Sequence, residues 1–79
     1  MNKISDFFST SDIGVTTVLS LYYPVYLIDK SDPTRAVFFF KRESGLDELI
    51  QSYWNRELKI EPQLLLSQRR QIQRRLNEI

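Results

Sequence analysis

The chain of 79 residues contains no cysteine and no histidine. Without cysteine it cannot form the disulfides that small secreted domains usually need, and without histidine it lacks the commonest general base and metal ligand. We therefore expect a cytoplasmic protein with no metal site and no cofactor. Because it has only two glycines and three prolines, few positions can interrupt a helix or a strand.

Long apolar stretches are also absent. The longest uninterrupted apolar run, Ala36 to Phe40, is far shorter than the ~20 residues of a membrane-spanning helix, and residues 1–6 lack the apolar segment of a signal peptide. We therefore expect no membrane span and no signal peptide. The composition is typical of one folded domain over residues 1–79, with a flexible start at residues 1–7. A chain this short buries only about 60–65% of its unfolded surface, which favours a partner or self-association.

The first half of the chain combines one helical pattern with two strand patterns. Hydroxyl and carboxylate side chains at residues 9–12 predict a helix that starts at about Thr10, with Phe8 on its apolar stripe, and ends at about Leu21. Two apolar segments with high strand propensity follow, residues 25–28 and 35–41, joined by a polar turn. They predict an antiparallel hairpin.

Both predicted strands are apolar on both faces. Helices can cover one face of such a hairpin, but the other face would then expose large apolar side chains to water. We predict that this face contacts protein, either a larger partner or a second copy of the chain, through Tyr26, Val37 and Phe39.

Two further helices complete the expected fold. Capping residues at 44–47 predict a helix over about 45–56, and a proline in the first turn opens another over about 62–77. Residues 58–60 between them form a short extended connection or a third edge strand. The predicted fold is α+β in the order α-β-β-α-α, with the hairpin packed on the helices and with Trp54 anchoring the second helix. The expected core consists of Phe8, Val15, Val18, Leu19, Leu27, Phe38, Leu49, Ile50, Tyr53, Leu65 and Ile72.

The last predicted helix carries two Arg-Arg pairs. At about 100° per residue, four apolar side chains fall within an arc of about 60° and form its buried stripe. Arg70 and Arg74 lie together opposite this stripe, Arg75 lies on one flank, and Arg69 lies beside the stripe. The stripe consists of Leu65, Ile72, Leu76 and Ile79.

The arginines favour an anionic partner. Arginine neutralises the phosphates of nucleic acids, and Gln71 adds an amide donor and acceptor beside them. Three interpretations are open: nucleic acid or an acidic protein surface, each contacted by Arg70, Arg74, Arg75 and Gln71, or simple solvation of a terminal helix. The net charge of only +1 provides little long-range steering.

No pattern predicts catalysis. The carboxylates form no paired motif, the serines have no histidine to activate them, and two isolated glycines make no phosphate-binding loop. We predict a non-enzymatic binding module, a subunit or adaptor of a nucleic-acid-associated assembly that uses the basic last helix. The alternative is a protein-only interaction, oligomerisation or regulatory module that uses the aromatic hairpin.

Several short motifs follow one another along the chain. They are Phe8, Thr10 and Asp12 as a Phe-x-Thr-x-Asp opening, the hydrophobic residues 37–40, Tyr53-Trp54-Asn55 at a helix end, Ile60-x-Pro62, and the basic tail. Their order resembles a family of short prokaryotic domains of unknown function. The resemblance spans about residues 8–76, supports the α-β-β-α-α order and implies no activity.

Overall fold

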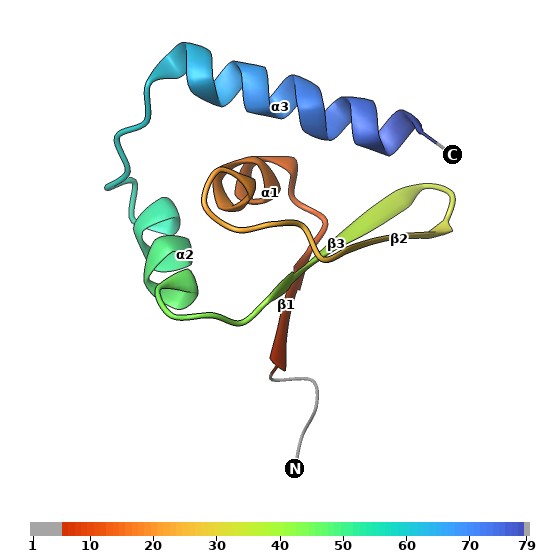
Figure 1. Ribbon diagram of the computed structural model, residues 1–79, viewed down its shortest axis with the longest axis horizontal. Coiled ribbons are helices and arrows are strands. Elements are labelled where there is room, and N and C mark those ends of the chain that lie inside the picture. Colours follow the sequence, from red (N-terminus) through yellow and green to blue (C-terminus); the bar gives the residue numbers. More distant parts are fainter. Residues whose placement is uncertain (1–5, 79) are drawn as a thin grey trace.

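A computed structural model describes residues 6–78 of the chain. Three strands and three helices follow one another in the order β-α-β-β-α-α (Figure 1). The predicted α+β class is confirmed, and the order differs from α-β-β-α-α by an additional strand at the start. Residues 1–5 of the expected flexible start lie outside the described residues, whereas Phe7 already belongs to the first strand.

The strands form an antiparallel sheet in the order β1-β3-β2. β2 (Leu27–Asp32) and β3 (Arg35–Lys41) make the predicted hairpin. β1 (Phe7–Thr10) pairs with the other side of β3, where Phe8 lies opposite Phe40. The prediction that this opening segment joins the first helix is therefore wrong, because its backbone groups pair with β3 instead.

β2 begins later than predicted and continues through the polar residues 29–32. An irregularity in the pairing between Asp29 and Asp32 accommodates this segment in the strand. The carboxylate of Asp32 then accepts hydrogen bonds from the backbone N and the hydroxyl of Thr34, at 2.9 and 2.7 Å. The turn of the hairpin is thereby confined to Pro33 and Thr34.

α1 (Ile13–Ser20) begins after Asp12, whose carboxylate accepts a hydrogen bond from the backbone N of Val15 at 2.9 Å. The helix starts later than predicted because β1 extends through Thr10. Tyr22 lies beyond the helix end and is 58% exposed. The buried residues of α1 are Val15, Thr16, Thr17, Val18 and Leu19.

α2 (Leu46–Trp54) and α3 (Pro62–Asn77) follow, and α3 has the predicted bounds. The N-cap of α2 is Gly45, at a φ of 89°, and no side chain caps this helix end, so the predicted capping by Ser44 is wrong. Glycine suits this left-handed backbone. A Cβ at Gly45 would also lie 2.8 Å from the hydroxyl oxygen of Tyr23, which donates a hydrogen bond to the Ser44 carbonyl.

Trp54 ends α2 and is 60% exposed, so the prediction that it anchors the helix in the core is wrong. Its ring meets the Tyr53 ring edge-on, with 5.1 Å between centroids, and Tyr53 is the residue that packs against the core. Residues 58–60 form no strand. The third strand of the sheet is β1 and not the predicted segment after α2.

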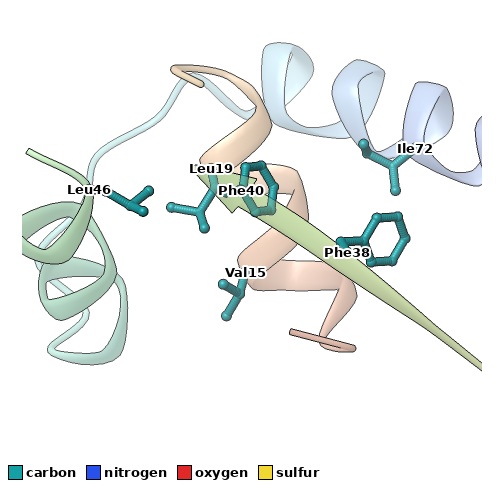
Figure 2. Packing of buried hydrophobic residues seen from close by; sticks show 6 residues of the cluster. All are labelled: Val15, Leu19, Phe38, Phe40, Leu46 and Ile72. Carbon is teal, nitrogen blue, oxygen red and sulfur yellow. The ribbon is translucent and has the colours of Figure 1, made fainter. Parts of the chain in front are cut away.

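The core lies between the helices and one face of the sheet (Figure 2). Phe38 and Phe40 project from β3 toward α1, and Ile72 reaches Phe38 from α3. Sequence analysis missed Phe40 as a core residue and wrongly included Leu27, which is 51% exposed. The central buried cluster consists of Val15, Leu19, Phe38, Phe40, Leu46 and Ile72.

Helices cover one face of the sheet, with α1 between α3 and the hairpin and α2 beside α1 (Figure 1). Paired residues of neighbouring strands share a face, and successive residues alternate between faces. Phe38 and its partner Ile28 therefore face the core, whereas Phe39 and its partner Leu27 face away from it. Among residues 6–78, no element covers this second face, which we call the outer sheet face.

Candidate binding surfaces

Both ends of α3 are fixed by hydrogen bonds. At its start, Pro62 occupies the first turn and the Glu61 carboxylate accepts hydrogen bonds from two backbone N–H groups, at 2.8 and 3.1 Å. At its end, Lys30 of β2 donates from Nζ to the carbonyl oxygens of Arg75, at 3.2 Å, and Glu78. A cation is favourable there because the helix dipole is negative at its C-terminus.

One side of α3 packs against the rest of the molecule. Ile72 is buried, and Leu76 packs against the core cluster beside it. Gln68 donates a hydrogen bond from Nε2 to a serine hydroxyl at the end of α1, at 2.9 Å. The predicted stripe thus faces inward at Leu65, Ile72 and Leu76, and its last member, Ile79, lies outside the described residues.

The solvent side of α3 carries an open, shallow depression of about 400 Å³ between side chains of this one helix, which we call the α3 groove. Of the predicted contact residues, Arg70 and Arg74 line it, whereas Arg75 and Gln71 are exposed but lie outside it. Sequence reasoning left several lining residues out of the site, although their helical spacing places them on the same side. The groove is lined by Leu66, Arg69, Arg70, Gln73, Arg74 and Asn77.

The arginines of α3 form no salt bridge within residues 6–78, although Asp12 lines an adjoining hollow together with Arg69. α3 contains four arginines and no acidic residue. Within residues 6–78 there is one salt bridge, between Arg42 and Asp47. It does not involve an arginine of α3. The groove therefore has a local excess of positive charge, although the whole chain has a net charge of only +1.

A second hollow of about 330 Å³ lies between the start of α1, Tyr53 and α3. Most of its lining is apolar, and it shares Leu66 and Arg69 with the α3 groove, so the two hollows adjoin. Gly14 allows Tyr53 to approach α1 here, because a Cβ on Gly14 would lie 2.3 Å from the Tyr53 hydroxyl oxygen.

The outer sheet face brings together the predicted protein-contact residues. Val37 and Phe39 lie on it as alternate residues of β3, and Leu27 lies beside Phe39. The Phe7 ring lies 4.9 Å from the Tyr26 ring, with the ring planes tilted by 45°, so Tyr26 joins this face although it precedes β2. Tyr26 and Leu27 are 57% and 51% exposed, which is unusual for large apolar side chains in one patch.

Opposite charges flank this apolar patch along the strands. Asp29 lies opposite Val37 toward the hairpin turn, and Lys41 lies opposite Phe7 at the other end of β3. The backbone N of Ser31 donates a hydrogen bond to the Asp29 carboxylate at 2.9 Å and lowers the pKa of that group. Asp29 is therefore ionised at neutral pH.

A three-stranded antiparallel sheet with helices on one face defines a small α+β domain. The chain belongs to the family described as a domain of unknown function, DUF5659, which matches residues 5–78. The resemblance to a family of unknown function is thereby confirmed. Comparisons with curated proteins and with solved structures find no match.

Two structural searches over residues 6–78 are also negative. No group of three or more acidic side chains is placed to hold a metal ion in this part of the chain. No described helix is both long enough and apolar enough to cross a membrane.

Proposed function

We propose that this protein is a non-enzymatic binding module that contacts nucleic acid through the α3 groove, as a subunit or adaptor of a cytoplasmic assembly. The observation that carries this proposal is the grouping of Arg69, Arg70 and Arg74 in one solvent-facing groove, where none of them forms a salt bridge within residues 6–78. Guanidinium groups bind phosphate oxygens strongly, often with two parallel hydrogen bonds. Gln73 and Asn77 lie between and beyond the arginines and offer further donors.

The arrangement of the aromatic residues favours phosphate contacts over base stacking. Proteins that bind single strands combine a basic groove with exposed rings on which bases stack. Here Phe38 and Phe40 are buried, and the rings of Tyr26 and Phe39 lie on the sheet and not in the α3 groove. We therefore expect binding that depends strongly on salt and weakly on sequence.

The double variant Arg70→Gln plus Arg74→Gln tests this function. Labelled single- and double-stranded oligonucleotides are titrated with protein at several salt concentrations. We expect the variant to bind more weakly, with a salt slope lower by about two units, because two phosphate contacts are lost. Circular dichroism should show an unchanged fold, since both side chains are exposed.

The matched control is Arg56→Gln plus Lys59→Gln, which removes the same charge from exposed positions outside α3. This control should change the salt slope far less than the α3 variant. Equal effects of the two variants would show that net charge, and not the α3 groove, governs binding. No binding of any nucleic acid by the wild type would overturn the proposal and favour an acidic protein surface as the partner of Arg70 and Arg74.

A second candidate function is a protein-interaction or oligomerisation module. The observation that favours it is the outer sheet face, which no element within residues 6–78 covers and on which Tyr26, Leu27, Val37 and Phe39 form one apolar patch. Apolar patches of this kind mark protein contacts in soluble domains. The two functions use different surfaces and are compatible in one molecule.

A further inference from the structure

We propose that the outer sheet face binds a second copy of this chain, with the two sheets packed face to face about a two-fold axis. The proposal rests on the second candidate function, because it takes the outer sheet face as a protein-contact surface. It names the partner of that surface and is independent of nucleic-acid binding at the α3 groove.

The strand registers divide the outer sheet face into three rows across the strands. The central row holds Leu27 and Phe39, with the exposed Ser9 of β1 beside Phe39. Two residues further along β3 toward the hairpin turn, the next row holds Asp29 and Val37. Two residues the other way, the third row holds Phe7 and Lys41.

A two-fold axis brings the central row of one copy onto the central row of the other, and brings the two outer rows together. In a closed dimer each copy uses the same patch, so the patch must fit its own rotated image. An axis that runs across the strands through the central row stacks Phe39 and Leu27 on their counterparts. It also places the third row of each copy over the Asp29–Val37 row of the other.

This apposition pairs the charges that flank the patch. The side chain of Lys41 crosses Val37 of the second copy and its amine reaches the adjacent Asp29 of that copy, so the dimer contains two such pairs. Stacked sheets lie about 10 Å apart, a gap that lysine and aspartate side chains bridge together. Among residues 6–78, Lys41 forms no ion pair within its own chain. The two-fold dimer requires Asp29 and Lys41 to lie at equal distances on either side of the central row, as they do. Binding of an unrelated partner would not require this spacing.

A charge-swap series tests the proposal by analytical ultracentrifugation of the full chain. The proteins are the wild type, Asp29→Lys, Lys41→Asp, and the double variant that exchanges the two charges. Each single variant places like charges together twice, and we expect it to weaken the dimer by about tenfold or more. The double variant restores opposite charges at both contacts and should recover most of the affinity.

Phe39→Lys is a second variant designed to disrupt the dimer. Unlike Asp29→Lys, it keeps the hydrogen bond between the Asp29 carboxylate and the backbone N of Ser31. It should make the protein monomeric while circular dichroism shows a folded chain, because Phe39 lies outside the core cluster. A wild type that stays monomeric at the highest soluble concentration overturns the proposal. So does a double variant that associates more weakly than both single variants.

The same variants separate this proposal from nucleic-acid binding. If the charge swap restores the dimer while no variant binds nucleic acid, the second copy is supported and the α3 proposal fails. If the wild type is a monomer and its salt slope is lowered by Arg70→Gln plus Arg74→Gln, the α3 proposal stands and the second copy is excluded.

Discussion

Of the two glycines in the chain, Gly14 leaves the least space for an added side chain, because Tyr53 packs directly against it. Gly14 lies in the first turn of α1, and an added Cβ would lie 2.3 Å from the Tyr53 hydroxyl oxygen. In an unconstrained helix, alanine is more stable than glycine by about 1 kcal/mol. Here the two effects oppose each other, and the overlap should dominate because both elements are packed in place.

We predict that Gly14→Ala destabilises the wild type by about 1–3 kcal/mol, as expected for overpacking. In a Tyr53→Phe background the hydroxyl is gone, and the nearest atoms are the Asp12 carboxylate at 3.1 Å and the ring carbon Cζ at 3.4 Å. The same substitution should then be neutral or stabilising. Urea denaturation of the four proteins measures this cycle, and equal destabilisation in both backgrounds would show that the hydroxyl is not the cause.

Tyr53 and Trp54 also show why sequence analysis misplaced a core residue. Successive helix residues point about 100° apart, so both rings flank the apolar stripe of a nine-residue helix. Which ring is buried depends on how α2 sits against α1, and that is set by tertiary contacts. Tyr53 packs against α1 near Gly14, which leaves Trp54 exposed at the helix end.

At the scale of the elements, α3 was predictable and β1 was not. α3 has sixteen residues, a proline in its first turn and a repeated apolar spacing, which are all local signals. β1 has four residues, and its Ser9 and Thr10 are typical of a helix cap. Its pairing partner β3 lies about thirty residues further along the chain, so local patterns do not reveal it.

The candidate site was predictable to a similar extent. The helical wheel placed Arg70 and Arg74 together on the exposed side, where they now line one groove. Leu66, Gln73 and Asn77 complete the lining at helical spacings from these arginines, so the sequence also contained the signal for them. The outer sheet face followed from apolar residues on both sides of β3, whereas its charged rows required the strand register.

The hairpin should weaken in acid because of two turn carboxylates. Backbone N–H groups of Ser31 and Thr34 donate to Asp29 and Asp32 and lower the pKa of each carboxyl below its ordinary value of 3.8. A lowered pKa in the folded state means that the ionised form favours folding. This contribution is complete above the ordinary pKa and is lost as the pH falls through the lower folded pKa.

We predict a decrease in thermal stability below about pH 4 that is smaller in Asp29→Asn plus Asp32→Asn than in the wild type. The difference should be modest because both carboxylates are exposed and screened by solvent. Thermal melts across this pH range measure it, and NMR titration of the two carboxyl carbons locates the pKa values directly. Carboxyl pKa values at or above 3.8 would contradict the assigned hydrogen bonds.

At the scale of the whole molecule, helices cover one face of the sheet, whereas no element within residues 6–78 covers the apolar side chains on the other face. One side of the sheet buries Phe38 and Phe40, while the other leaves Leu27 half exposed. A second copy would add stability through mass action, because association favours the folded state whenever only folded chains associate. The α3 groove carries its charge on a different element, so the proposed assembly and the proposed anion binding would not compete for the same residues.

The melting temperature should therefore depend on protein concentration. For a folded dimer that unfolds to two chains, a tenfold increase in concentration should raise the Tm of a domain this size by about 3–5 °C. Phe39→Lys should melt at one temperature at all concentrations, because its unfolding starts from a monomer. Differential scanning calorimetry over a wide concentration range makes the comparison. A wild-type Tm that does not change with protein concentration would contradict the proposed dimer.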